Sequence, residues 1–157
     1  MINKIFGIIK GMSLEFLDNF MHDQLVRASA STYSPTDLQR FGLQITSNTS
    51  TQKVRYLGTA TNPIYPDIVI WRPDYPNANT GQAVIVELLE NQTFTHGGVP
   101  AWIRLSSATG IRFNLIVPLE QVSNAKKIIS TNKITNINLQ AWLFDKNTNK
   151  YQFKIET

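Results

Sequence analysis

Cysteine is absent from the 157 residues of this chain, and that absence narrows the chemistry open to it. Disulfide bonds, thiolate nucleophiles and cysteine-rich zinc sites are all excluded. The only histidines are His22 and His96, which is too few to favour a zinc site built from imidazoles. Because no disulfide framework exists, the redox state of the compartment is not constrained by the sequence.

Several other sequence signals are missing. No run approaches the roughly 20 apolar residues that span a bilayer. The apolar start of the chain is interrupted by Lys10 before it reaches signal-peptide length, and no small-residue cleavage site follows. Gly97-Gly98 lacks the spacing of a phosphate-binding loop, and the hydroxyl residues lack the partners of a serine hydrolase. We therefore expect a soluble, cytoplasmic protein.

Charge is also scarce, since 17% of the residues are charged, against roughly 25% in average soluble domains. The net charge is nevertheless +4 and the sequence pI is about 9.4. Such a mild basic excess suits nucleic acid only if the cations gather on one face, whereas scattered cations merely aid solubility. The candidate cations are Lys53, Arg55, Arg72, Arg104, Arg112, Lys126 and Lys127.

The length and the 42% hydrophobic content fit one domain over residues 1–157, with residues 1–12 as a flexible N-terminal extension. Leu14, Leu17, Met21 and Leu25 form an apolar stripe that predicts a helix over about 14–29. Residues 31–51 are polar and rich in loop formers, apart from a short helical turn that starts at 34–37. Further helices are predicted over 101–108 and 119–130, and strands over 53–57, 67–72, 82–89, 111–117, 137–144 and 151–155.

The arrangement of these segments predicts an α/β fold with a central mixed β-sheet flanked by helices. Residues 73–81 are dense in turn formers, so the strands on either side should form an antiparallel pair with a long tip. The apolar runs in this pair are continuous rather than alternating, which indicates central strands covered on both faces. The following strand, helix, strand, helix, strand order predicts parallel crossovers.

Two acidic residues stand out against these apolar runs. Asp67 opens one run and Glu87 closes the next, so neighbouring strands could bring both carboxylates to one end of the sheet. Oxygen ligands of this kind suit a hard divalent cation. Alternatively, Asp67 caps a turn after Pro66. Burying Glu87 without a partner would cost several kcal/mol, unless it lies at an exposed edge.

The remaining polar candidates have simpler interpretations. Glu90 is expected to be solvated, and so is the polar face of the first helix, which carries His22 and Asp23. His96 lies in a glycine-rich turn and is expected to have a surface or capping role, with metal binding or proton transfer as the alternative. Trp102 and Trp142 fall inside predicted elements and are expected in the core.

The order of elements and motifs resembles the PD-(D/E)XK, or restriction-endonuclease-like, superfamily. Pro66-Asp67 looks like its first motif, and Glu87-Leu88-Leu89 lies where its Glu-x-Lys would fall, with leucine at the lysine position. The later segments 102–105, 113–118 and 125–129 resemble the tail of a compact branch. The resemblance covers roughly residues 14–144 and implies the core order α-β-β-β-α-β-α-β.

The resemblance implies a Mg²⁺ or Mn²⁺ site formed by Asp67, Glu87 and the carbonyl oxygen of Leu88. It further implies hydrolysis of phosphodiester bonds in DNA or RNA, with a homodimer left open. Leu89 cannot activate water as the family lysine does, so either another cation takes that role or the domain is an inactive module that binds protein or nucleic acid. The predicted nucleic-acid contacts are Lys53, Arg55, Arg72 and Arg104.

Overall fold

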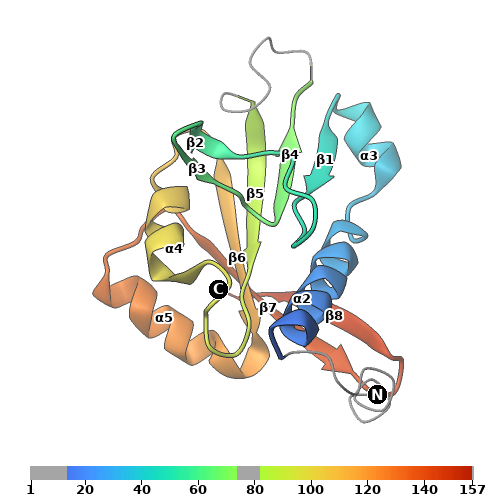
Figure 1. The fold of residues 1–157 in the computed structure, drawn as a ribbon, viewed down its shortest axis with the longest axis vertical. Coiled ribbons are helices and arrows are strands. Elements are labelled where there is room, and N and C mark those ends of the chain that lie inside the picture. The colour runs from blue at the N-terminus through green and yellow to red at the C-terminus, as the bar shows by residue number, and fades with distance from the viewer. Residues whose placement is uncertain (1–13, 74–81, 157) are drawn as a thin grey trace.

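The computed structural model describes residues 14–73 and 82–156, which form a mixed α/β fold (Figure 1). The helices are α2 (Leu14–Ala30), α3 (Pro35–Arg40), α4 (Gly98–Ser106) and α5 (Val122–Thr131), with a 3₁₀ turn η1 at Leu119–Gln121. The main sheet has six strands, β1 (Gln44–Ser47), β4 (Ile68–Trp71), β5 (Ala83–Leu89), β6 (Arg112–Pro118), β7 (Asn138–Asp145) and β8 (Lys150–Ile155). A separate hairpin joins β2 (Leu57–Thr59) to β3 (Asn62–Ile64).

The strand order in the main sheet is β1-β4-β5-β6-β7-β8. Strands β4 and β5 pair antiparallel, whereas β5, β6 and β7 run parallel and are connected through α4 and α5. The antiparallel pair and the parallel crossovers predicted from the sequence are therefore confirmed. Strand β8 closes one edge of the sheet, as predicted, and β1 closes the other.

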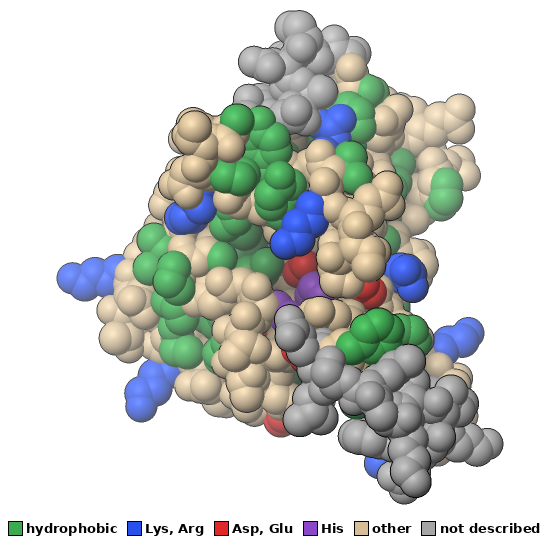
Figure 2. Space-filling view, viewed as in Figure 1, with side chains coloured by type: hydrophobic (Ala, Val, Ile, Leu, Met, Phe, Trp, Pro, Cys, Tyr) green, Lys and Arg blue, Asp and Glu red, His purple; other side chains and the backbone are tan. Residues whose placement is uncertain are grey.

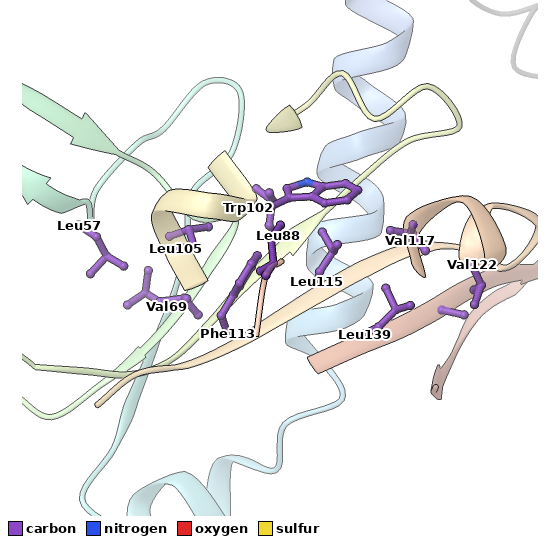
Figure 3. Packing of buried hydrophobic residues seen from close by; sticks show 14 residues of the cluster. Leu57, Val69, Leu88, Trp102, Leu105, Phe113, Leu115, Val117, Val122 and Leu139 are labelled. Carbon is purple, nitrogen blue, oxygen red and sulfur yellow. The ribbon is translucent and has the colours of Figure 1, made fainter. Parts of the chain in front are cut away.

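Helices cover both faces of this sheet (Figure 1), which explains the continuous apolar runs. Val86 and Leu88 of β5 pack in one core cluster with Trp102 of α4. Figure 3 shows Leu88 next to Trp102. Leu89 of the same strand packs in the second cluster, with Val26 of α2. Removing a Leu or Val side chain of this kind from water contributes about 1.5–3 kcal/mol.

The structure corrects the sequence prediction around the edge strand. Residues 53–56 are not a strand, and the edge is instead formed by Gln44–Ser47, within the segment predicted to be loop. This polar strand is stabilised by pairing with β4 and by the Trp71 indole, which donates to Thr46 Oγ1 at 3.0 Å. In contrast, the short helix α3 is confirmed, with Ser34 as its N-cap.

Other predictions fall outside the structural description or are tested only in part. The proposed N-terminal extension, residues 1–12, and most of the hairpin tip, residues 74–81, lie outside the described residues. Within the described residues, no helix combines the length and apolar character needed to cross a membrane.

Candidate functional site

Glu87 is buried, with 2% of its surface exposed, and both of its carboxylate oxygens have donors. Ser29 Oγ donates to Oε1 at 2.8 Å, and Tyr33 OH donates to Oε2 at 2.6 Å. Asn114 Nδ2 also donates to Oε2, at 3.2 Å. Charge-assisted hydrogen bonds of this kind offset the cost of burying a carboxylate. The hydrogen bonds of Glu87 therefore connect the end of α2 to β5 and β6.

The Tyr33 hydroxyl is kept protonated in this arrangement. Burial, followed by the negative charge of Glu87 and the hydrogen bond to it, raises the pKa of Tyr33 well above its usual range. The phenol is consequently a permanent donor to the carboxylate at neutral pH.

Asp67 has a different set of partners at the start of β4. Its Oδ2 accepts a hydrogen bond from the Leu89 amide at 2.7 Å, and its Oδ1 lies 3.3 Å from Nε2 of His22. Its own amide donates to the Glu87 carbonyl at 2.9 Å. The residue as a whole is 8% exposed, so Asp67 is held against the end of β5.

Asp67 and Glu87 consequently share no side-chain partner. Ile68 is the residue paired with Glu87, and continuing this register puts Asp67 opposite Leu88. Because side chains alternate between the faces of a sheet, this offset of one residue separates the two acids. A large cavity beside the sheet is lined by Asp67 and Leu88 but not by Glu87.

The ligand set predicted from the resemblance does not fit a divalent cation in this arrangement. Both oxygens of Glu87 are already occupied by protein donors, so Asp67, Glu87 and the Leu88 carbonyl do not form an open ligand set. Among residues 14–73 and 82–156, no group of three or more His, Asp or Glu side chains is arranged to hold a metal.

The structure brings the two histidines together beside Asp67. The rings of His22 and His96 lie 3.9 Å apart, with an interplanar angle of 33°. His22 Nε2 lies 3.2 Å from the Leu89 carbonyl, which can only accept, so this nitrogen carries a proton. On the other side, His96 Nε2 lies 3.7 Å from Asp18 Oδ2. The prediction that His22 is solvated is thus wrong.

The environments of the two imidazoles shift their pKa values in opposite directions. Burial opposes the charged form of His22, but the hydrogen bond and charge of Asp67, with Leu89 and Asp23, together raise its pKa above the usual value. Burial and then the proximity of His22 lower the pKa of His96. Near neutral pH, His22 is the better proton donor and His96 is the better acceptor.

Glu90 is fully buried, which corrects the expectation that it is solvated. Its Oε1 accepts hydrogen bonds from the Gly97 and Gly98 amides at 2.7 and 3.0 Å, at the start of α4. These amides have no partner within the helix, so the carboxyl group caps it. Oε2 finds no hydrogen-bond partner among the described residues. Burial raises the pKa of Glu90 despite these hydrogen bonds.

A glycine at position 97 permits this cap. A Cβ atom there would lie 2.5 Å from Leu88 Cδ2 and 3.0 Å from Glu90 Oε1. A larger residue would push the start of α4 away from Glu90 and from the cavity that this turn lines.

The cavity has a volume of about 470 Å³ and lies between α2, the loop before β2 and the start of α4. Figure 2 shows acidic and histidine side chains gathered at the centre of this face, with a basic side chain beside them. Within residues 14–73 and 82–156, the charged side chains that line the cavity are those of Lys53, Arg104 and Asp67, apart from the two histidines. The full lining is Asn19, His22, Asn48, Thr49, Ser50, Lys53, Pro63, Ile64, Tyr65, Asp67, Leu88, His96, Gly97, Pro100, Ala101 and Arg104.

The two cations retain donors that can reach a ligand. Lys53 is exposed, and its Nζ lies 5.7 Å from the centre of the Tyr65 ring. Arg104 donates one hydrogen bond, from a terminal nitrogen to the Asn62 carbonyl at 2.7 Å, which orients its guanidinium group. A guanidinium has five N–H donors, so Arg104 can bind an anion as well.

Two of the four predicted nucleic-acid contacts are not at this cavity. Arg55 packs over the Trp71 ring, 3.1 Å from its centre. Arg72 is exposed five residues after Asp67, or about 16 Å along an extended chain. These four basic residues therefore do not form one continuous stripe, and Lys53 and Arg104 are the two of them that line the cavity.

Sequence reasoning considered His96 for metal binding or proton transfer but did not predict its contact with His22. The two histidines are brought together by tertiary packing between α2 and the turn before α4, which no local sequence pattern predicts. The expectation that Asp23 is solvated is also wrong, because it accepts hydrogen bonds from the amide and hydroxyl of Ser50 at 3.0 and 2.6 Å. The isolated acids on the polar face of the first helix were the only available signal.

Comparisons with known proteins do not identify a family for this chain. Neither a scan against protein-family models nor searches of curated proteins and solved structures return a match to this chain. The function is therefore argued from the site itself.

Proposed function

We propose that this protein binds nucleic acid and that a backbone phosphate occupies the 470 Å³ cavity. The observation that carries the proposal is the charge of the lining, which among the described residues consists of the cations Lys53 and Arg104 and the carboxylate of Asp67. His22 lies beside that carboxylate, and its Nε2 proton is directed at the Leu89 carbonyl. A phosphate group is recognised by such a combination of cations and N–H donors.

The order of elements supports a restriction-endonuclease-like core as part of this proposal. A helix precedes an antiparallel pair, and two parallel strands follow through intervening helices. Asp67 stands at the head of β4, where the resemblance puts the first acid of the superfamily. The β2–β3 hairpin is an addition to that order, and it supplies Pro63 and Ile64 to the cavity.

Binding without cleavage is the form of the proposal that the contacts favour. A buried Glu87 would favour a nuclease if it had no structural partner, but the donors Ser29, Tyr33 and Asn114 give it one. The second candidate is hydrolysis of phosphodiester bonds with Mg²⁺ or Mn²⁺. It is favoured by the presence of Asp67 in the cavity, with one oxygen engaged only by the 3.3 Å contact to His22.

The proposal is tested by fluorescence anisotropy with labelled single-stranded and duplex oligonucleotides over a range of salt concentrations. The double variant Lys53→Ala/Arg104→Ala should weaken binding, and the slope of log K against log[salt] should flatten by about 0.7 for each phosphate of a single strand that is no longer neutralised. The matched control is Arg27→Ala/Lys127→Ala, which removes the same charge from exposed positions outside the cavity. Equal weakening in both variants would contradict binding at the cavity.

Incubating the same oligonucleotides with Mg²⁺ or Mn²⁺ separates the two candidates. We expect intact strands. Cleavage that requires the metal and disappears in Asp67→Asn would favour the nuclease instead.

A further inference from the structure

A second, smaller cavity of about 150 Å³ adjoins the first, and His22 and His96 line both. It lies between α2, the segment after β5 and the β7–β8 pair. Its lining consists of Asp18, Met21, His22, Leu25, Glu90, Asn91, Gln92, His96, Trp142 and Tyr151. The stacked histidines therefore stand between a cationic cavity and a largely apolar one.

Aromatic side chains form one side of this smaller cavity. The Trp142 and Tyr151 rings lie 5.8 Å apart, with an interplanar angle of 72°. Trp142 is fixed by a hydrogen bond from its indole nitrogen to the Glu90 carbonyl, at 3.0 Å. Rigid aromatic surfaces of this kind stack on the faces of unpaired nucleobases.

Polar groups are few in this lining. The carboxyl group of Glu90 is fully buried and accepts hydrogen bonds from the Gly97 and Gly98 amides, so it is not open to a ligand. Gln92 lies at the exposed end of the lining. Its amide can hydrogen-bond the edge of a base.

The volume suits a single ring system. A cavity of about 150 Å³ is sufficient for one benzene-sized ring. A pyrimidine matches this volume more closely than a two-ring purine does.

We propose that the 150 Å³ cavity receives an unstacked pyrimidine base of a single strand whose phosphate lies in the neighbouring 470 Å³ cavity, with the His22–His96 pair between them. This inference rests on the proposed function, because the phosphate delivers the base to the pocket.

The test compares four labelled single strands of equal length, which are oligothymidylate, oligouridylate, oligodeoxyadenylate and a fully abasic strand with the same phosphates. The pyrimidine strands should bind the full-length protein roughly fivefold to a hundredfold more tightly than the abasic strand, as expected for one stacked base. Oligodeoxyadenylate should bind like the abasic strand. Oligothymidylate and oligouridylate differ in the 5-methyl group and in the 2′-hydroxyl, so oligodeoxyuridylate, which shares its base with one and its sugar with the other, assigns any difference between them.

Two variants localise the effect. Met21→Trp fills the cavity, and Tyr151→Leu removes a ring while keeping an apolar side chain. Two variants are used so that the test can still be made if one of them does not fold. Each should abolish the preference for pyrimidine while leaving abasic-strand binding unchanged. Phe144→Leu is the matched control, since Phe144 contacts Tyr151 at 5.2 Å between ring centres but does not line the cavity.

The outcomes distinguish the two proposals. Equal binding of all four strands would overturn the base pocket and retain the phosphate site. Absence of binding by every strand, the abasic one and the duplex oligonucleotides included, would overturn the proposed function itself. A pyrimidine preference that survives both cavity variants would locate the base elsewhere and refute the pocket.

Discussion

Replacing Glu87 with glutamine tests whether this residue stabilises the fold through its hydrogen bonds or serves as a metal ligand. Glutamine keeps the size of the side chain and one acceptor oxygen. With that oxygen facing the Tyr33 hydroxyl and the Asn114 amide, the NH₂ group meets Ser29 Oγ, which can accept a hydrogen bond. The variant therefore loses the negative charge that strengthens all three hydrogen bonds.

The expected cost follows from these contacts. A hydrogen bond to a charged group contributes about 1.5–3 kcal/mol, so we expect a loss of roughly 2–4 kcal/mol in the free energy of unfolding. For a chain of this size, the melting temperature should fall by about 4–16 °C. Urea denaturation followed by circular dichroism measures the loss, with Glu156→Gln, at the C-terminal end of β8, as the matched control.

A double-mutant cycle with Tyr33→Phe checks the cause. Removing the hydroxyl should be costly in the wild-type protein and less costly in Glu87→Gln, with a coupling of about 1 kcal/mol or more. A carboxylate kept for catalysis behaves differently, because functional residues are often held at the expense of stability. A Glu87→Gln variant as stable as wild type, or more stable, would refute the structural role.

Four further predictions concern the two histidines, Asp67, Gly97 and Glu87. In an NMR titration, His22 should titrate above about pH 6.5 and His96 below it. Because the pKa of His22 is raised in the folded state, the stability that His22 contributes is present below about pH 6.5 and is lost as the pH rises through its folded pKa. Asp67→Asn should lower the His22 pKa, and an unchanged value would contradict the contact between them. Gly97→Ala should destabilise the protein by about 1–3 kcal/mol, because the added Cβ would meet Leu88 at 2.5 Å; a normal melting temperature would count against the tight turn. Calorimetric titration with Mn²⁺ should give no heat that depends on Glu87, and heat that disappears in Glu87→Gln would restore the metal site.

The sequence predicted much of the sheet because its signals there are local. The turn-rich segment after Trp71 predicted the antiparallel β4–β5 pair, and the alternation of strands and helices predicted the parallel strands that follow. The strand β1 was missed because its apolar alternation is limited to Leu43 and Ile45 within a polar segment. Its stability comes from pairing with β4 and from the packing of these two residues against the second core cluster, contacts that depend on the folded sheet.

The candidate site was predicted less well, for reasons of register and distance along the chain. Both acids were recognised, but an offset of one residue between β4 and β5 decides whether they meet, and composition cannot specify it. Glu90 was predicted to be solvated because polar residues follow it. Its burial depends on Gly97 and Gly98 returning over it.

The hydrogen bonds of Asn48 affect how quickly a ligand enters the 470 Å³ cavity. Its amide nitrogen donates to the carbonyls of Arg55 and Pro66, and its oxygen accepts from the amides of Val54 and Arg55. The rim that bears Lys53 is thereby preorganised, so little conformational entropy should be lost on association. We expect simple one-step kinetics, with a rate constant that falls as ionic strength increases and no slow closing phase.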